Sequence, residues 1–264
     1  MPTYFESTGM LAFQIAKKSL LLITNNFYDV LRICAVLYLL NVIVNVLATY
    51  ALTGIWAVEK VEFDDEEINS GLVALMVIGS ILVSAIVTLW VAVTWHRYVL
   101  LEEAPNGWIP RWNKSANLSY FYQFLKLVLI FFVLGLMIAV IVATSVGNTG
   151  NLGFLFSAII VVMSVAFGFT ALKMSLIFPS AAVETNMGVV DSWSMTGPYN
   201  KTLLALTVAS VGFGFLYETI AGLLDVNMFT SSIRFFLNAF FGFWGLSVLT
   251  TLYGIIVEGR EMED

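Results

Sequence analysis

Six apolar runs, each long enough to cross a lipid bilayer, constrain this chain more than any other feature of its sequence. An α-helix needs about 20 apolar residues to span roughly 30 Å of hydrocarbon. The runs lie near residues 30–57, 71–100, 118–145, 153–178, 201–224 and 231–257. Hydrophobic residues make up 59% of the chain, more than a soluble core of 264 residues could hide. We therefore predict an all-α, polytopic membrane protein in which residues 1–264 form a single integral membrane domain.

The basic residues are unevenly divided between the two ends of the predicted bundle. Six spans put both termini on one side of the membrane, and ten of the twelve Lys and Arg residues fall on that side. Only Lys60 and Arg234 fall on the other side. Because cytoplasmic loops carry the excess of Lys and Arg, we predict that the end of the bundle with both termini faces the cytoplasm. Both termini and the 101–117 loop are expected in the cytoplasm.

Several classes of function are disfavoured by the composition. A net charge of -6 argues against a nucleic-acid partner. His96 and Cys34 are the only residues of their types and lie in different predicted helices, which argues against a zinc site and a Cys–His pair. The acidic segment 62–69 lacks the alternating ligands and central glycine of a calcium loop. We therefore predict no catalytic, cofactor-binding or metal site, and no enzyme.

The stretch "TWHRYVLLEE" ends the second predicted span. Arg97 lies where this helix leaves the bilayer, so we expect it to reach lipid phosphates, with His96 as a neighbouring residue of the interface. Glu102 and Glu103 do not lie three or four positions from Arg97, which is the spacing of helical partners. We predict instead that Arg97 forms an ion pair with Glu184 or Asp191.

A short pattern recurs where the even-numbered spans end. Its copies are Thr94-x-x-Arg97, Thr170-x-x-Lys173 and Thr250-x-x-Tyr253. This predicts three helical hairpins, approximately 8–104, 105–186 and 187–264, each beginning with an amphipathic helix on the cytoplasmic surface. The middle hairpin fits least well because Pro110 interrupts its surface segment.

The surface segment of the third hairpin has the pattern of a helix that lies in the membrane interface. Val189, Val190 and Trp193 share one helical face, whereas Asp191 and Ser192 point elsewhere. The sequence therefore predicts that Trp193 faces the lipid.

Polar side chains recur every four residues within the first two spans. Asn41 and Asn45 lie on one face of the first span, and Ser80, Ser84 and Thr88 lie on one face of the second. Such rows either bond across a helix interface or line a path for a solute, and we favour the interface. Small residues spaced by four predict close helix packing at Gly135, Ala139, Ala143, Ser164 and Gly168.

Glu218 and Arg234 are charged residues in the outer part of the last two spans. They lie eight positions either side of Val226, at the turn that joins these spans, so an antiparallel hairpin places them at similar depth. An unpaired charge inside a membrane is costly. We predict that Glu218 and Arg234 form an ion pair that joins the two helices; the alternative is a proton or cation site at Glu218.

Two segments carry a resemblance to a known group of proteins. They are "WHRYVLLEEAPNGWIPRW" and "LKMSLIFPSAAVETNMGVVDSWSMTGPYNKTLLAL". The chain resembles poorly characterised bacterial inner-membrane proteins, similar to the YciC-type proteins and to the membrane domain fused to some glycerophosphodiester phosphodiesterases. The motif residues of the second segment are Lys173, Leu176, Pro179, Glu184, Ser192, Trp193, Thr196, Gly197 and Tyr199. The resemblance implies a six-helix fold and no established activity, and Lys173 departs from the arginine often found there.

These observations predict a non-catalytic inner-membrane protein without a cofactor. We expect it to bind membrane lipids or other membrane proteins as a scaffold, assembly or accessory factor. One alternative is a small-solute permease that uses the Asn and Ser/Thr rows. Another is the membrane module of a lipid-metabolising system.

Overall fold

A computed structural model describes residues 4–53, 70–146, 153–223 and 228–261, and these contain helices, turns and loops but no strand. The acidic segment 62–69 and Lys60 lie outside the described residues. The α-helices are α1 (Tyr4–Asn25), α2 (Phe27–Thr53), α3 (Ser70–Leu101), α4 (Lys114–Val146), α5 (Gly153–Met174), α6 (Ile177–Ala182), α7 (Val189–Met195), α8 (Asn200–Gly222) and α9 (Met228–Ile256), with a 3₁₀ turn at Gly197–Tyr199.

Six segments of the described chain are helical, long and apolar enough to cross a membrane. They lie in α2, α3, α4, α5 together with α6, α8 and α9. The prediction of an all-α polytopic membrane protein with six spans is confirmed. The reason is simple: a run of about 20 apolar residues satisfies its backbone hydrogen bonds in lipid only as a helix or in a closed barrel.

The first and third hairpins each begin with a surface helix, and the middle one does not. α1 precedes α2 and α7 precedes α8, whereas residues 102–113 form no helix before α4. In α1 the buried residues Ala12, Ile15, Ser19 and Ile23 follow helical spacing and face the bundle. This face packs against α8 and α9.

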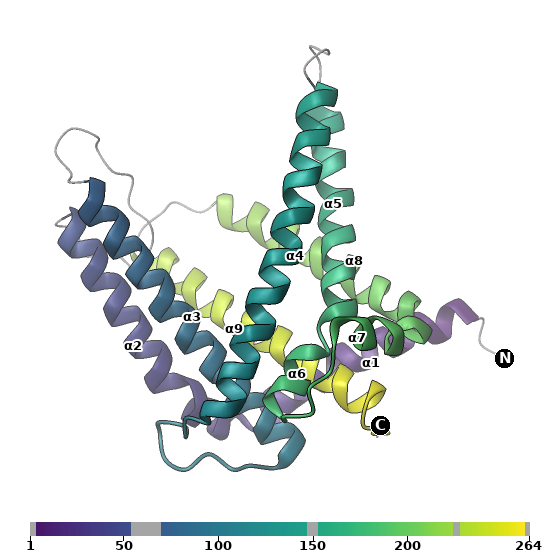
Figure 1. Cartoon of the computed structure of the whole chain (residues 1–264), viewed down its shortest axis with the longest axis horizontal. Coiled ribbons are helices and arrows are strands. Elements are labelled where there is room, and N and C mark those ends of the chain that lie inside the picture. Colours follow the sequence, from purple (N-terminus) through teal and green to yellow (C-terminus); the bar gives the residue numbers. More distant parts are fainter. Residues whose placement is uncertain (1–3, 54–69, 147–152, 224–227, 262–264) are drawn as a thin grey trace.

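The two ends of the bundle differ in how tightly they are packed (Figure 1). We call the basic end the one at which α3, α5 and α9 finish and α2, α4 and α8 begin. Its buried core is built from residues of several helices, among them Ile15, Leu100, Leu203 and Leu252. Towards the opposite end the α2–α3 pair and the α4–α5 pair diverge (Figure 1). Large apolar side chains are exposed there, including Ile43, Ile81, Leu129, Leu216 and Phe236.

Most close packing joins different hairpins. α2 lies along α3 in the first hairpin and α4 packs on α6 in the middle one, but α5 packs on α8, and α9 packs on α1 and α3. At Gly168 of α5, an added Cβ would lie 2.9 Å from the Thr207 Cγ2 of α8, so the predicted close approach is confirmed. A Cβ at Gly135 would meet nothing within 4 Å, so that prediction was wrong. The side chains of Ala139 and Ala143 lie outside the described part of the chain.

The segment that joins α5 to α8 folds into a compact hook at the basic end. α5 stops at Met174, α6 follows after a turn, and α6 ends in a reversal at Glu184, which has a positive φ of 62°. The Thr185 N–H donates to the Ser180 carbonyl at 2.9 Å, and the Glu184 N–H to the Ala181 carbonyl at 3.3 Å. These two bonds are those of a Schellman helix end, a position where glycine is usual.

The C-terminal segment packs against the end of α3 and against α1 at the basic end. Beyond α9, Arg260 donates from Nη1 to the Val99 carbonyl at 3.1 Å and from Nη2 to the Leu100 carbonyl at 2.9 Å. The last carbonyls of a helix have no partner within the helix, so this contact satisfies the end of α3. Lys18 of α1 donates to the Glu261 carbonyl at 3.0 Å, which fixes the tail to the surface helix.

Candidate functional site at the basic end

Arg97, at the end of α3, is held by two carboxylates from different parts of the chain. Its Nε and Nη2 donate to the two carboxylate oxygens of Glu103 at 2.8 and 2.5 Å. Its Nη1 donates to the Ala182 carbonyl at 2.9 Å and lies 3.5 Å from the Glu184 carboxylate. The Arg97–Glu184 ion pair predicted from the sequence is therefore present. We call Arg97, Glu103 and Glu184 the clasp, because they join the end of α3 to the hook.

The bond between Arg97 and Glu103 was not predicted. Helical spacing excluded this partner, but α3 ends at Leu101 and Glu102 has a positive φ of 56°. The chain reverses there, which brings the next carboxylate back to the guanidinium. Two planar groups then meet in the bidentate geometry that makes arginine–carboxylate bonds strong.

Asp191 is not a partner of Arg97 and has a local role. Its carboxylate accepts the Gly188 N–H at 3.0 Å, at the start of α7. α7 is fixed to the bundle by its neighbour Ser192, which is fully buried and donates to the Lys173 carbonyl at 2.7 Å. An acidic residue in the first helical turn also interacts favourably with the helix dipole.

Trp193 projects from α7 away from the buried Ser192. It is 42% exposed, and the Lys173 ammonium nitrogen lies 4.1 Å from the centre of its ring. Val190, on the same helix, is 80% exposed. The uncovered apolar face predicted for this surface helix is present, and the cation–π contact holds the indole in place.

His96 lies in the interior of the protein, so the expectation that it is an interfacial residue was wrong. Its side chain is fully buried, with Nδ1 2.8 Å from the Thr250 hydroxyl oxygen and Nε2 3.3 Å from the Tyr120 hydroxyl oxygen. These partners come from α9 and α4, so one imidazole joins three helices. The recurrence of Thr250 in the repeated pattern was the one sequence signal for this contact.

Three polar side chains within the first two spans bond to one another: Asn41, Asn45 and Ser84. The Asn45 amide nitrogen donates to the Asn41 side-chain oxygen at 3.0 Å and to the Ser84 hydroxyl at 3.3 Å. Ser84 in turn donates to the Asn41 side-chain oxygen at 2.8 Å. The predicted bonding across the helix interface is confirmed for Asn41, Asn45 and Ser84. Ser80 instead donates to the Val77 carbonyl of its own helix at 3.0 Å, and Thr88 is exposed.

The predicted ion pair between Glu218 and Arg234 is wrong. Within the described residues, Arg234 donates through Nη2 to the Ala221 carbonyl and forms no ion pair with Glu218, which is exposed. The Tyr217 hydroxyl approaches the Arg234 carbonyl at 3.5 Å. Equal depth in a hairpin does not fix the direction of a side chain around its helix, and here the end of α8 offered Arg234 a free carbonyl.

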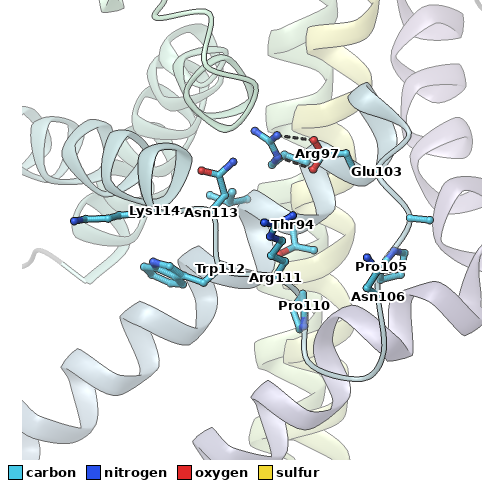
Figure 2. A pocket seen from close by; sticks show the side chains of 12 residues that line it. Thr94, Arg97, Glu103, Pro105, Asn106, Pro110, Arg111, Trp112, Asn113 and Lys114 are labelled. Carbon is cyan, nitrogen blue, oxygen red and sulfur yellow. Dashed lines mark hydrogen bonds and ion pairs between the residues drawn. The ribbon is translucent and has the colours of Figure 1, made fainter.

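A polar pocket of about 590 Å³ adjoins the clasp. Figure 2 shows its walls: Thr94 and Arg97 come from the last turns of α3, and the rest is the chain from Glu103 to Lys114. Three basic side chains and one acidic side chain line it, in a protein whose net charge is -6. Arg111 and Lys114 are among the ten basic residues that indicated the topology, and their place in this pocket depends on the path of the loop.

The loop that forms this pocket is held firmly against α2 and α3. Arg32 of α2 donates from Nε to the Gly107 carbonyl at 3.3 Å. The Trp108 ring meets Tyr28 edge-on at 6.1 Å between centroids. The Trp112 ring meets Trp90 of α3 edge-on at 5.0 Å. These contacts fix the path of the loop that lines the pocket.

Comparisons with protein-family models, with curated protein sequences and with solved structures find no match for this chain. The resemblance to the YciC-type group accordingly stays a prediction. Among the described residues, no group of three His, Cys, Asp or Glu side chains could hold a metal ion. His96, Arg97 and the Asn41–Asn45–Ser84 set bond between helices or between a helix and a loop. The pocket beside Arg97 and the exposed apolar surfaces are therefore the places where another molecule could bind.

Proposed function

We propose that this protein is a non-catalytic scaffold, assembly or accessory factor of the bacterial inner membrane that binds membrane lipids or other membrane proteins, with both termini in the cytoplasm. The observation that carries the proposal is the contrast between its ends. The basic end is tied together by polar contacts such as His96–Thr250, while the opposite half leaves apolar helix faces uncovered. A rigid base that supports diverging helices is suited to receiving another membrane protein.

One groove in the membrane-spanning part fits a partner helix. It lies between α2 and α9, has a volume of about 750 Å³ and is lined almost entirely by apolar side chains, many of them aromatic. Along α2 it runs from Phe27 to Val42, which at 1.5 Å per residue is roughly 23 Å. That length covers most of the ~30 Å hydrocarbon thickness, whereas one lipid chain covers a single leaflet.

Gentle native purification followed by mass spectrometry tests the proposal. We expect a membrane protein to remain bound in a fixed ratio. Ala239→Trp, which fills the groove, should release it, whereas Leu237→Trp on the same helix, outside the groove lining, should not. Retention of the partner by both variants would place the contact elsewhere, and absence of any partner would contradict the scaffold role.

The permease alternative is tested in the same preparation. Asn41, Asn45 and Ser84 bond to one another, which occupies the groups that a solute would need. Proteoliposomes containing the purified protein are expected to take up no solute faster than empty vesicles. Uptake that is lost in Asn41→Ala would favour a transport function over the scaffold.

The orientation needs its own experiment. In a Cys34→Ala background, which removes the single native thiol, cysteines introduced within 59–69 should react with an impermeant reagent in intact cells. A cysteine at Asn106 should react only after the membrane is opened. The reverse pattern would invert the proposed topology.

A further inference from the structure

We infer that the pocket between the end of α3 and the loop 103–114 binds the phosphate headgroup of an anionic phospholipid, held by Arg111 and Lys114. This inference deepens the lipid-binding side of the proposed function but does not need a protein partner. It starts from the charges in the pocket. Arg97 is already paired with Glu103 and Glu184, so its charge is largely balanced within the protein.

Arg111 and Lys114 are different from Arg97. Both are exposed and line the pocket, and neither has a hydrogen bond, ion pair or ring contact among the described residues. In Figure 2, Arg111 lies in the middle of the pocket near Thr94, and Lys114 extends from the start of α4 on the same side as Trp112. A guanidinium with an ammonium close in sequence is a combination that recognises phosphate: the first supplies two parallel donors and the second a point charge.

The surroundings of the pocket indicate a lipid and not a soluble phosphate. Trp108, Ile109 and Trp112 are large, exposed apolar residues on the same loop. Tryptophan is enriched at the level of the headgroups in membrane proteins. A pocket framed by such residues lies at the depth where lipid phosphates are found.

The face of α4 that begins at Lys114 offers a path for the acyl chains. Leu118, Phe121 and Leu125 follow Lys114 at intervals of four, three and four residues, so they share one side of the helix. All three are exposed within this protein. A headgroup at Lys114 therefore places its chains on an uncovered apolar stripe that leads toward the middle of the membrane.

The test measures lipid retention by the purified full-length protein. The protein is titrated in neutral detergent with phosphatidylglycerol, phosphatidylcholine or inorganic phosphate, and bound molecules are counted by native mass spectrometry while Trp fluorescence is recorded. We expect binding of phosphatidylglycerol well above phosphatidylcholine, and no comparable binding of inorganic phosphate. Equal affinity for inorganic phosphate would overturn the lipid assignment in favour of a soluble phosphate compound.

Two double variants remove the same amount of charge from the same end. Arg111→Gln/Lys114→Gln should weaken phosphatidylglycerol binding about 30-fold, because each basic residue near an anionic surface contributes roughly fivefold. Lys17→Gln/Lys201→Gln should leave it unchanged. Equal losses of phosphatidylglycerol binding in both variants would mean that only the total charge of this end matters. Unchanged binding in Arg111→Gln/Lys114→Gln would overturn the proposed site. Melting temperatures show whether each variant is folded. Retention of a protein partner is measured separately, so a failure of the scaffold proposal can be told apart from a failure of the lipid site.

Discussion

The same apolar spans run through the basic end and the opposite half of this protein, yet only the basic end is closely packed. At the basic end, polar side chains from sequence-distant helices bond to one another, as in Ser19 to Thr251 at 2.9 Å and Thr185 to Tyr253 at 2.9 Å. In the opposite half, large side chains such as Leu75 and Leu216 are exposed. Lipid tails are as apolar as leucine, so burying leucine against leucine gains little in a membrane.

The pair α2–α3 supports this explanation. It stays together beyond the basic end, and it contains the bonded set Asn41, Asn45 and Ser84 within its interface. Towards the opposite end this pair diverges from α4 and α5 (Figure 1). Specific polar contacts and close backbone approaches, more than hydrophobicity, determine where these helices associate.

The largest effect is expected from breaking the buried contact at His96. His96→Ala should lower the free energy of unfolding by about 2 to 4 kcal/mol, because it leaves a cavity and two buried hydroxyls without a partner. The change in stability is measured by the loss of helical circular dichroism on heating in detergent. Thr88→Ala, on the exposed face of the same helix, serves as the control, and an equal loss in both would mean that the basic end is not specially stabilised.

Arg97→Gln, which opens the clasp, should lower the free energy of unfolding by a smaller amount, about 1 to 3 kcal/mol. The reason is that three hydrogen bonds from a charged donor are removed. Arg111→Gln, whose side chain has no partner in the described part of the chain, should leave stability unchanged. Glu184→Gly separates two effects at one position: glycine suits the positive φ of 62° but removes the ion pair. It should therefore cost less than Arg97→Gln, and a cost as large would contradict a role for the backbone turn.

The two glycines of the predicted seams provide a matched comparison between the packed and open regions. Gly168→Ala should destabilise by about 1 kcal/mol or more, because the new Cβ meets a methyl of Thr207, whose hydroxyl is bonded to the Leu203 carbonyl at 2.8 Å. Gly135→Ala meets nothing within 4 Å and should be neutral or stabilising by up to about 1 kcal/mol. Thermal denaturation in detergent measures both variants. A lower melting temperature for Gly168→Ala and an unchanged or higher one for Gly135→Ala would support the difference between the two regions, whereas shifts of the same sign would contradict it.

The smallest effect concerns the polar set between α2 and α3. A double-mutant cycle of Asn41→Ala and Ser84→Ala should give a coupling energy of roughly 0.6 kcal/mol, the average for such contacts in membranes. Coupling near zero would mean that α2 and α3 stay together for another reason. The cycle is measured by reversible unfolding in detergent, with Ser80→Ala as the control because Ser80 bonds only its own helix, at the Val77 carbonyl.

The sequence by itself determined the six spans and the surface helices α1 and α7. It also indicated that Asn41 and Asn45 bond across a helix interface, and it limited the expected partner of Arg97 to Glu184 or Asp191. Each of these depends on local periodicity or on the cost of leaving a polar group alone in a membrane, and both can be evaluated residue by residue. The placement of Trp193 on an uncovered face follows for the same reason.

Tertiary structure alone decided the rest. Glu103 reaches Arg97 only because the backbone reverses at Glu102, and His96 is buried only because Thr250 and Tyr120 arrive from other helices. Arg234 was expected to meet Glu218 but found the Ala221 carbonyl at a helix end. Sequence spacing gives the depth of a residue along its helix, whereas contact also requires the rotation of each helix and the path of each loop, and these are fixed only when the whole bundle packs.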